Sequence, residues 1–344
     1  MRVGVLTGGG DCPGLNAVIR AAVRVGAGAH GHRHVGLHGG WRGLLRRDTQ
    51  PLDRDVVAPI LTRGGTILGS SRTNPFKDPD GGAQCERAFA DLGLDALIAI
   101  GGEDTLGVAR RLFTDHGLPV VGVPKTIDND LSGTDYTFGF WTAVQIAVDA
   151  IDRLHTTGES HDRTMVVEVM GRHAGWIALE AGLAGGAHAI LIPERQATLD
   201  AVCARIAARR ERGRRYSVIV VSEGVVLDDA AGDGELDEFG HPLMAKAGVG
   251  DRLAEGVSQR LGVEARAVVL GHVQRGGTPI AYDRSLATRF GARAAEMVAE
   301  GAFGRMAALH GDAVEDVPLT DAVSELKTVP PETYERVGRI IGTD

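Results

Sequence analysis

Charged side chains gather directly after two apolar runs in the middle of the chain, residues 96–100 and 120–123. They are Glu103 and Asp104 after the first run and Lys125, Asp128 and Asp130 after the second. Short apolar runs that end in turns containing glycine or proline are typical of buried parallel strands. Carboxylates and one cation at the carboxyl ends of two such strands suit a metal-bound phosphate held beside a catalytic base.

A third turn that could bind a ligand follows the apolar residues 3–7. Three consecutive glycines, residues 8–10, lead from this expected strand to an expected helix at 15–25. A strand, a glycine turn and a helix start together form a cradle for an anion. The turn is not a Walker A loop, because GxxxxGK(S/T) is absent. The polar, glycine-rich segment 63–72 ends in Arg72, which is a candidate to bridge phosphates.

Charged residues also follow the expected strands of the second half of the chain. They are Arg172, Glu223, His272 and Arg275. Guanidinium groups bind phosphate through paired hydrogen bonds, and a carboxylate suits sugar hydroxyls. The residues therefore indicate phosphoryl transfer between two phosphate-bearing ligands, one of them a phosphorylated sugar.

Strands and helices alternate along the chain and position these turns. The pattern predicts strands at 3–7, 35–37, 96–100, 120–123, 164–169, 189–192, 217–222 and 266–270, and helices at 15–25, 56–61, 85–92, 106–116, 140–154, 174–183, 199–209, 250–261 and 281–299. Such alternation predicts an α/β fold with parallel sheets and right-handed crossovers. The acidic stretch 228–240 is expected to be a mobile surface insertion.

Composition narrows the class of protein. The chain has 344 residues, 43% of them hydrophobic and 24% charged, which suffices for two domains with ample cores. The formal net charge of −8 argues against nucleic-acid binding. Three cysteines without paired spacing indicate neither a disulfide framework nor a zinc site. Without a signal peptide or an apolar run of transmembrane length, the expectation is a cytoplasmic protein with no membrane contact.

Five motifs closely resemble those of the 6-phosphofructokinase family and occur in that family's order. They are residues 9–16 (GGDCPGLN), 101–105 (GGEDT), 124–130 (PKTIDND), 170–175 (MGRHAG) and 271–277 (GHVQRGG). The resemblance implies two αβα three-layer domains with mainly parallel sheets and an active-site cleft between them. It assigns residues 1–139 and 253–305 to the phosphoryl-donor domain. Residues 140–252 and 306–344 would form the fructose 6-phosphate domain and the C-terminal tail.

The same resemblance implies a role for each candidate residue. Asp128 would take the proton from the sugar 1-hydroxyl, and Glu103 would organise Mg²⁺ where the family has an aspartate. Gly10 and Arg72 match positions that contact the phosphoryl donor. The positions that match the sugar-phosphate site are Thr126, Asp130, Met170, Gly171, Arg172, Glu223, His272 and Arg275. Arg163 and Arg266 match arginines that reach this site from a neighbouring subunit, which implies a homodimer or a homotetramer.

Two residues depart from the pattern of ATP-using bacterial members, which typically carry glycine where Asp104 and Lys125 stand. Asp104 would place bulk and negative charge beside the α-phosphate and ribose of a nucleotide. Lys125 supplies a cation for the end of a shorter donor. The pair resembles the pyrophosphate-dependent branch of the family, which implies reversible transfer from pyrophosphate to fructose 6-phosphate. An ATP-dependent enzyme is the alternative, because Asp104 could instead cap the following helix.

The same residues argue against two other classes of protein. A regulatory subunit without activity usually lacks the base or the metal acid, yet Asp128 and Glu103 are both present. A relative of diacylglycerol or NAD kinases would lack the motifs at 124–130 and 271–277. Near the family's effector positions lie Arg20, Arg24 and Arg54, and His155 replaces an arginine that is usual there. Arg214 and Arg215 belong to the basic run 209–215, which is expected to be a solvated helix end. We expect weak or absent control by adenine nucleotides or phosphoenolpyruvate.

Overall fold

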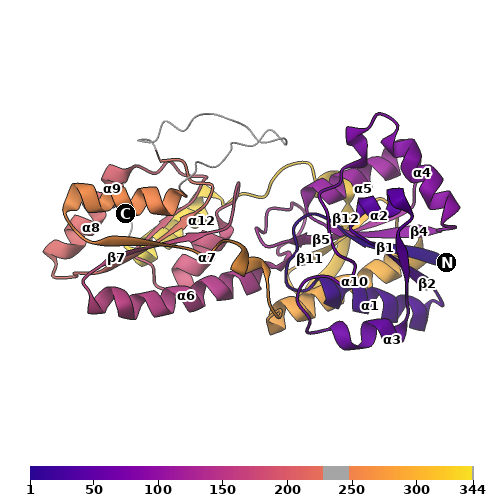
Figure 1. The fold of residues 1–344 in the computed structure, drawn as a ribbon, viewed down its shortest axis with the longest axis horizontal. Helices are drawn as coiled ribbons and strands as arrows, with labels where there is room; N and C mark the ends of the chain where they lie inside the picture. Colours follow the sequence, from indigo (N-terminus) through magenta and orange to yellow (C-terminus); the bar gives the residue numbers. More distant parts are fainter. Residues whose placement is uncertain (228–247, 343–344) are drawn as a thin grey trace. The chain divides into compact units, whose positions relative to one another are not determined.

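The computed structural model describes residues 1–227 and 248–342, which divide into two compact units (Figure 1). Unit 1 comprises residues 1–142 and 275–326, and unit 2 comprises residues 143–274 and 327–344. The chain therefore passes between the units after Thr142, after Gln274 and after Leu326. The acidic stretch 228–240, expected to be a mobile insertion, lies outside the described residues.

The sheet of unit 1 has the strand order β12-β11-β5-β4-β1-β2-β3, and β6 pairs with β5. The strands are β1 (Arg2–Thr7), β2 (Arg33–Leu37), β3 (Thr49–Leu52), β4 (Ala96–Gly101), β5 (Val120–Thr126), β6 (Phe138–Gly139), β11 (Arg305–His310) and β12 (Ala313–Pro318). Strands β2, β1, β4, β5 and β11 are parallel, while β3 and β12 close the two edges in antiparallel orientation. All six residues of β4 are buried, as a continuous apolar run at the centre of a parallel sheet requires.

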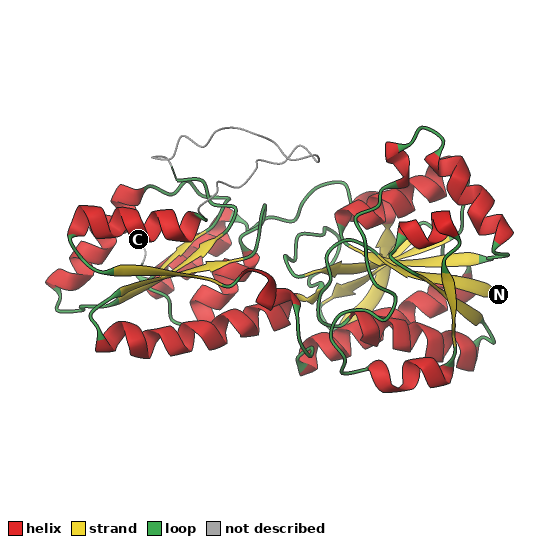
Figure 2. Ribbon diagram, in the orientation of Figure 1, coloured by secondary structure: helices red, strands yellow, loops and turns green. Residues whose placement is uncertain are grey.

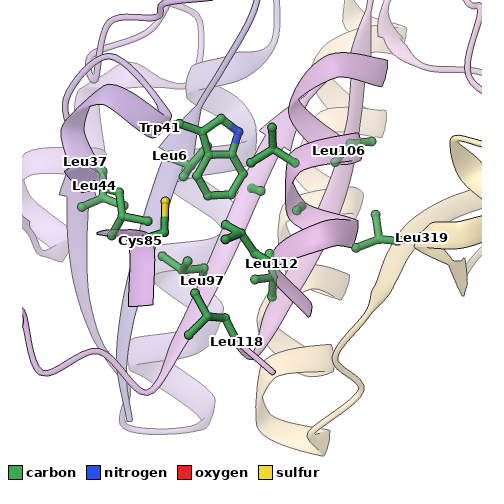
Figure 3. Packing of buried hydrophobic residues seen from close by; sticks show 14 of the residues in the cluster. Leu6, Leu37, Trp41, Leu44, Cys85, Leu97, Leu106, Leu112, Leu118 and Leu319 are labelled. Atoms are coloured by element: carbon green, nitrogen blue, oxygen red, sulfur yellow. The ribbon is translucent and has the colours of Figure 1, made fainter. Parts of the chain in front are cut away.

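Helices cover both faces of this sheet (Figure 2). They are α1 (Leu15–Ala29), α2 (Trp41–Arg46), α3 (Arg54–Val57), α4 (Gly81–Asp91), α5 (Glu103–His116), α10 (Ala281–Glu300), α11 (Leu319–Ala322) and the 3₁₀ turns η1 (Ala58–Ile60) and η2 (Pro75–Lys77). On one face, Trp41, Leu44 and Leu112 pack onto Leu6 and Leu97 of the central strands (Figure 3). On the other face α1 packs against α10, so closely that a Cβ on Gly291 would lie 2.4 Å from the Val18 carbonyl oxygen.

Unit 2 contains a parallel sheet with the order β10-β7-β9-β8. Its elements are β7 (Thr164–Val169), β8 (Ala189–Leu191), β9 (Ser217–Ser222), β10 (Ala265–Val269), α6 (Phe140–Ser160), α7 (Trp176–Ala184), α8 (Leu199–Glu211), α9 (Val249–Leu261), α12 (Pro331–Ile341) and the turn η3 (Gly271–Arg275). All six residues of β7 and of β9 are buried, since helices flank this sheet too (Figure 2). The predicted α/β fold with mainly parallel sheets is confirmed.

The observed unit boundaries differ from the expected domain ranges in three places, of which the shift of residues 140–142 to unit 1 is the smallest. Residues 253–274 belong to unit 2, because β10 pairs with β7 and Gly250 at the start of α9 donates to the Glu168 carboxylate at 2.7 Å. Residues 306–326 belong to unit 1, because β11 pairs with β5. The two larger corrections follow from strand pairings between distant parts of the sequence. Among the described residues, no helix is both long and apolar enough to cross a membrane.

Each unit contains a buried histidine whose pKa is well below its usual value. Burial lowers the pKa of His34 on β2 from its usual 6.5 to about 4, and the neighbouring His32 acts in the same direction. Burial and the nearby Arg209 lower the pKa of His188 to about 4, and the Nδ1 of this ring accepts a hydrogen bond from the Val218 N–H at 2.8 Å. Each side chain is therefore neutral in the folded protein at pH 6.

Acidification should destabilise the protein between pH 6.5 and 4, before most carboxylates titrate. In this window the unfolded chain takes up protons at these histidines and the folded chain does not, so the free energy of unfolding falls as the pH falls. Replacing His34 by Leu should remove about 2 kcal/mol of the loss between pH 7.5 and 5, as urea denaturation at both pH values would measure. The exposed His161, changed to Leu, is the matched control. Equal pH dependence in the wild type and the His34→Leu variant would contradict this account.

Candidate active site

The glycine loop after β1 is fastened to the carboxyl end of β4 and to the segment that carries Arg72. The Gly8 N–H donates to the Ile100 carbonyl oxygen at 3.0 Å. The Gly9 N–H donates to the Ser71 carbonyl oxygen, also at 3.0 Å. Arg72 is exposed and follows Ser71 directly, so the backbone that bears it lies beside the predicted anion cradle.

The glycine-rich segment 63–67 is held by a residue to which the sequence assigned no role. Asn16, near the start of α1, is fully buried. Its Nδ2 donates to the Arg63 carbonyl oxygen at 3.0 Å, and its Oδ1 accepts from the Ile67 N–H at 2.8 Å. One side chain thus replaces the hydrogen bonds that a strand partner would give this irregular segment.

Two glycines leave the space that the Thr105 side chain fills. A Cβ on Gly101 would lie 2.2 Å from the Thr105 Cβ, and a Cβ on Gly8 would lie 2.5 Å from the Thr105 Oγ1. This contact brings the start of α5 against the ends of β1 and β4. Glu103 and Asp104 therefore occupy the first turn of α5 with exposed side chains, next to the glycine loop.

Lys125 projects from β5 to the same loop. The residue is only 4% exposed, and its Nζ donates to the Gly10 carbonyl oxygen. Burial lowers the pKa of Lys125, and Arg275 acts in the same direction, whereas Asp130 and Asp128 raise it. An ammonium group has three N–H donors, so Lys125 can donate to a further acceptor in addition to the Gly10 carbonyl oxygen.

Asp128 follows β5 in a turn that two further residues shape. The Asp128 N–H donates to Thr126 Oγ1 at 3.0 Å. Asn129 adopts a φ of 52°, which asparagine tolerates better than most residues, and its Oδ1 accepts from the Thr137 N–H at 3.1 Å. Thr137 Oγ1 in turn donates to the Thr126 carbonyl oxygen at 2.8 Å. Asn129 and Thr137 thus position Asp128, and neither was predicted to do so.

The acidic residues of unit 1 fit Mg²⁺ bound together with a phosphate. Among the described residues, no group of three or more His, Cys, Asp or Glu side chains is placed to hold a metal ion. Glu103 at the end of β4 and Asp128 beyond the end of the adjacent β5 supply hard oxygen donors at one sheet edge. Mg²⁺ in phosphoryl-transfer sites is held by one or two carboxylates and completed by substrate phosphates.

Unit 2 gathers a second set of candidates at one edge of its own sheet. They are Met170, Gly171 and Arg172 after β7, Glu223 after β9 and His272 after β10, three parallel neighbouring strands. The Ser222 hydroxyl donates to the Gly171 carbonyl oxygen. A Cβ on Gly224 would lie 1.9 Å from the Arg172 carbonyl oxygen, so the turns after β7 and β9 are in direct contact.

Arg163 and Arg266 lie at the opposite end of that sheet. Arg163 precedes β7, and Arg266 pairs in register with Met165 near the start of β7. Their Nε and Nη2 atoms lie 2.8 and 2.9 Å from the Glu264 carboxylate, and hydrogen bonds from Arg163 and then Arg266 lower the pKa of Glu264. Six strand residues separate Arg163 from Met170, roughly 20 Å of extended chain. The arginines therefore do not reach the Met170 turn of their own chain.

Arg275 contacts the loop after β1. Its Nη1 donates to the Asp11 carbonyl oxygen at 3.3 Å. A Cβ on Gly10 would lie 2.6 Å from the same nitrogen, so glycine is required there for the guanidinium to approach the loop. Arg275 and Lys125 thus contribute two positive charges beside Gly10.

Glycine-rich and charged turns at the carboxyl ends of parallel strands define a class of α/β proteins that bind phosphate-bearing ligands. The sequence matches the Phosphofructokinase family over residues 2–298. The chain therefore belongs to the phosphofructokinase family.

Named relatives differ in their phosphoryl donor. A pyrophosphate--fructose 6-phosphate 1-phosphotransferase from Amycolatopsis methanolica is 61% identical over 99% of this chain and 100% of its own. An ATP-dependent 6-phosphofructokinase 3 from Streptomyces coelicolor is 54% identical over 97% of this chain and 98% of its own. Among solved structures, a pyrophosphate-dependent phosphofructokinase from Nitrosospira multiformis has the same fold, with a TM-score of 0.84 and 22% sequence identity. The match covers 96% of this chain and 86% of that one.

The contact between Gly101 and Thr105 should make residue 101 intolerant of any side chain. Gly101→Ala places a methyl group 2.2 Å from the Thr105 Cβ and should lower the free energy of unfolding by about 1–3 kcal/mol. Gly107→Ala, on α5 beside Thr105 and with no atom within 4 Å of the added Cβ, is the control and should stabilise by up to about 1 kcal/mol. Chemical denaturation of both variants measures the difference. Equal effects would show that the start of α5 can move away from β4.

Proposed function

We propose that this protein is a pyrophosphate-dependent 6-phosphofructokinase. The reaction transfers a phosphoryl group from pyrophosphate to the 1-hydroxyl of fructose 6-phosphate, giving fructose 1,6-bisphosphate and phosphate. The observation that carries the donor assignment is the presence of Asp104 and Lys125 at one glycine loop, with Lys125 Nζ bonded to Gly10. The 61% identical relative bears the name of this activity.

Asp104 is proposed to exclude nucleotides. A pocket of about 210 Å³ lies along α5, the helix that starts beside the glycine loop. Its lining includes Glu103, Asp104, Arg110, Arg111 and Phe76. A nucleotide α-phosphate about 4 Å from the Asp104 carboxylate would be opposed by roughly 4 kcal/mol at an effective dielectric of 20. The N-cap of α5 is Gly102 and Asp104 is the second residue of the helix, which weakens the alternative that Asp104 is its cap.

Lys125 is proposed to bind the terminal phosphate of pyrophosphate. Burial lowers its pKa, and a phosphate beside Nζ would act in the opposite direction. Arg72 and Arg275, both on segments that contact the glycine loop, add guanidinium groups that bind phosphate oxygens in pairs. Pyrophosphate and a sugar phosphate are of comparable phosphoryl potential, so the enzyme should work in both directions.

Asp128 is proposed to act as the base on the sugar hydroxyl. Hydrogen bonds of Thr126, Asn129 and Thr137 hold the backbone of the turn that bears Asp128, and Asp130 shares that turn. A bound Mg²⁺, held by Glu103 and the phosphates, would neutralise negative charge on the transferred group. Because phosphoryl transfer depends mainly on positioning and charge, a rigid turn for the base is what this site can contribute.

Fructose 6-phosphate is proposed to bind unit 2 through Arg172, Glu223 and His272, assisted by Met170 and Gly171. The guanidinium and imidazole groups suit the 6-phosphate, and the Glu223 carboxylate suits the sugar hydroxyls. The glycine at 171 has a φ of 127°, which lets the backbone turn sharply between the two side chains that flank it.

A homo-oligomer is proposed to complete the sugar site. Arg163 and Arg266 lie about a strand's length from the Met170 turn of their own chain, so they would serve a second copy. The edge strand β10 carries Arg266 together with Val269, which is 50% exposed, and Val273 follows at 61% exposed. An unpaired strand edge with exposed apolar side chains suits contact with another copy of the chain.

Initial rates with fructose 6-phosphate and Mg²⁺ test the proposal, with pyrophosphate and ATP compared at equal concentration. Turnover with pyrophosphate alone is expected. Asp128→Asn is the control for the chemical step, because it keeps the shape of the base and should lower kcat by about 10²- to 10⁴-fold. Turnover with ATP alone would overturn the donor assignment, and turnover with neither would indicate a regulatory subunit.

Removing the Asp104 carboxylate should admit ATP. In Asp104→Gly, kcat/KM for ATP should rise at least about tenfold, which corresponds to 1.4 kcal/mol, as the repulsion of a nucleotide phosphate is relieved. The rate with pyrophosphate should change less. Asp115→Gly, the same substitution near the other end of α5, controls for the loss of helix propensity. An unchanged ratio of ATP to pyrophosphate turnover would mean that Asp104 does not select the donor.

A further inference from the structure

The turn at residues 170–175, which carries Arg172, is hydrogen-bonded at both ends to the segments where the chain enters and leaves unit 2. The chain enters unit 2 at Ala143, leaves it after Gln274 and enters it again at Lys327. All of the contacts described next lie within unit 2. The hydrogen bonds from Gln274 to Met170, from Gln274 to Ala143 and from Trp176 to Lys327 each join residues more than 100 positions apart in the sequence.

Gln274 holds the first end of the turn. Its side chain is fully buried, and its Oε1 accepts from the Met170 N–H at 2.8 Å. Its Nε2 donates to the Ala143 carbonyl oxygen at 3.4 Å. Gln274 is the last residue of unit 2 before the chain passes to unit 1, and Ala143 is the first residue after the chain arrives. The amide thus joins the entry and the exit of the chain to the start of the turn.

Glu194 holds the second end of the turn. Its Oε1 accepts from the Gly175 N–H at 2.9 Å and from the Val329 N–H at 2.8 Å. The next residue, Trp176, donates its indole N–H to the Lys327 carbonyl oxygen at 2.8 Å. The segment 327–329, where the chain re-enters unit 2, is therefore bound to the end of the turn by a carboxylate and by an indole.

We propose that Gln274 and Glu194 are positioning residues that set the orientation of Arg172 for the sugar phosphate. The proposal rests on the function proposed above. In the part of the chain that the structure describes, the hydrogen bonds of both side chains go to backbone groups at the ends of the turn and in the adjoining segments, so each acts through the turn's geometry. Between these two anchors, Gly171 has a φ of 127°, and since glycine has more conformational freedom than other residues, the anchors at the two ends limit how this turn can bend. Displacement of a substrate-binding group by about 1 Å is enough to weaken a site greatly.

Gln274→Met and Glu194→Leu test the proposal, because each removes the anchoring hydrogen bonds while keeping the volume of the side chain. Each is expected to raise KM for fructose 6-phosphate about tenfold while leaving KM for pyrophosphate within about twofold. Glu194→Gln keeps an acceptor oxygen for both N–H groups and should restore most of the affinity. Backbone hydrogen exchange should quicken at residues 170–176 and stay unchanged on β4 and β5 of unit 1.

Gln259→Met and Glu255→Leu, on the exposed face of α9 in the same unit, are the matched controls. An equal rise of both KM values, or faster exchange throughout unit 2, would reduce Gln274 and Glu194 to general structural residues. Unchanged KM and unchanged exchange at 170–176 would overturn the proposal outright. A wild type inactive with fructose 6-phosphate would instead refute the proposed function, while the exchange measurement would still report whether the anchors hold the turn.

Discussion

A buried ammonium group is the feature of unit 1 on which its glycine-rich turns depend. Lys125 sits on a central strand, where burial disfavours its charge, and the Gly10 carbonyl oxygen and the carboxylates of Asp128 and Asp130 offset this cost. For the carbonyl to reach Nζ, the loop after β1 must pass very close to β5 and to Arg275. A Cβ on Gly10 would lie 2.6 Å from the Arg275 Nη1, and Gly9 has a φ of 76°, which favours glycine.

Unit 2 meets a different requirement with backbone hydrogen bonds. Its turns after β7 and β9 contact each other through Gly171 and Gly224, and neutral groups such as Ser222 and Gln274 hold them. Arg172, in the turn after β7, is partly exposed. The turn that carries it is held by hydrogen bonds of Gln274, Ser222 and Glu194 to backbone groups.

The sequence predicted those parts of the fold whose signals are local. The strand at 96–100 and the acids after it were found because an apolar run and a glycine turn lie side by side in the sequence. The strands β3 and β12 were missed because their antiparallel edge residues are polar and partly exposed, as in Ala313–Pro318. The domain ranges were wrong where pairing is distant, as for β10 with β7. Asn129 and Gln274 went unassigned because their partners lie 8 and more than 100 residues away.

The charge balance at the start of α5 explains how one fold serves two phosphoryl donors. A helix start attracts phosphate through its free N–H groups, and two acidic residues in the first turn, Glu103 and Asp104, oppose that attraction. An anion binds there only with compensation, which Lys125 and a metal ion carried by the phosphates can provide. Relatives that are 61% and 54% identical bear the names of different donors, so the fold itself does not choose between them. In the proposed function the choice rests on a few charges near one helix start, and pyrophosphate, which would place its whole charge close to Lys125, is the donor that this balance favours.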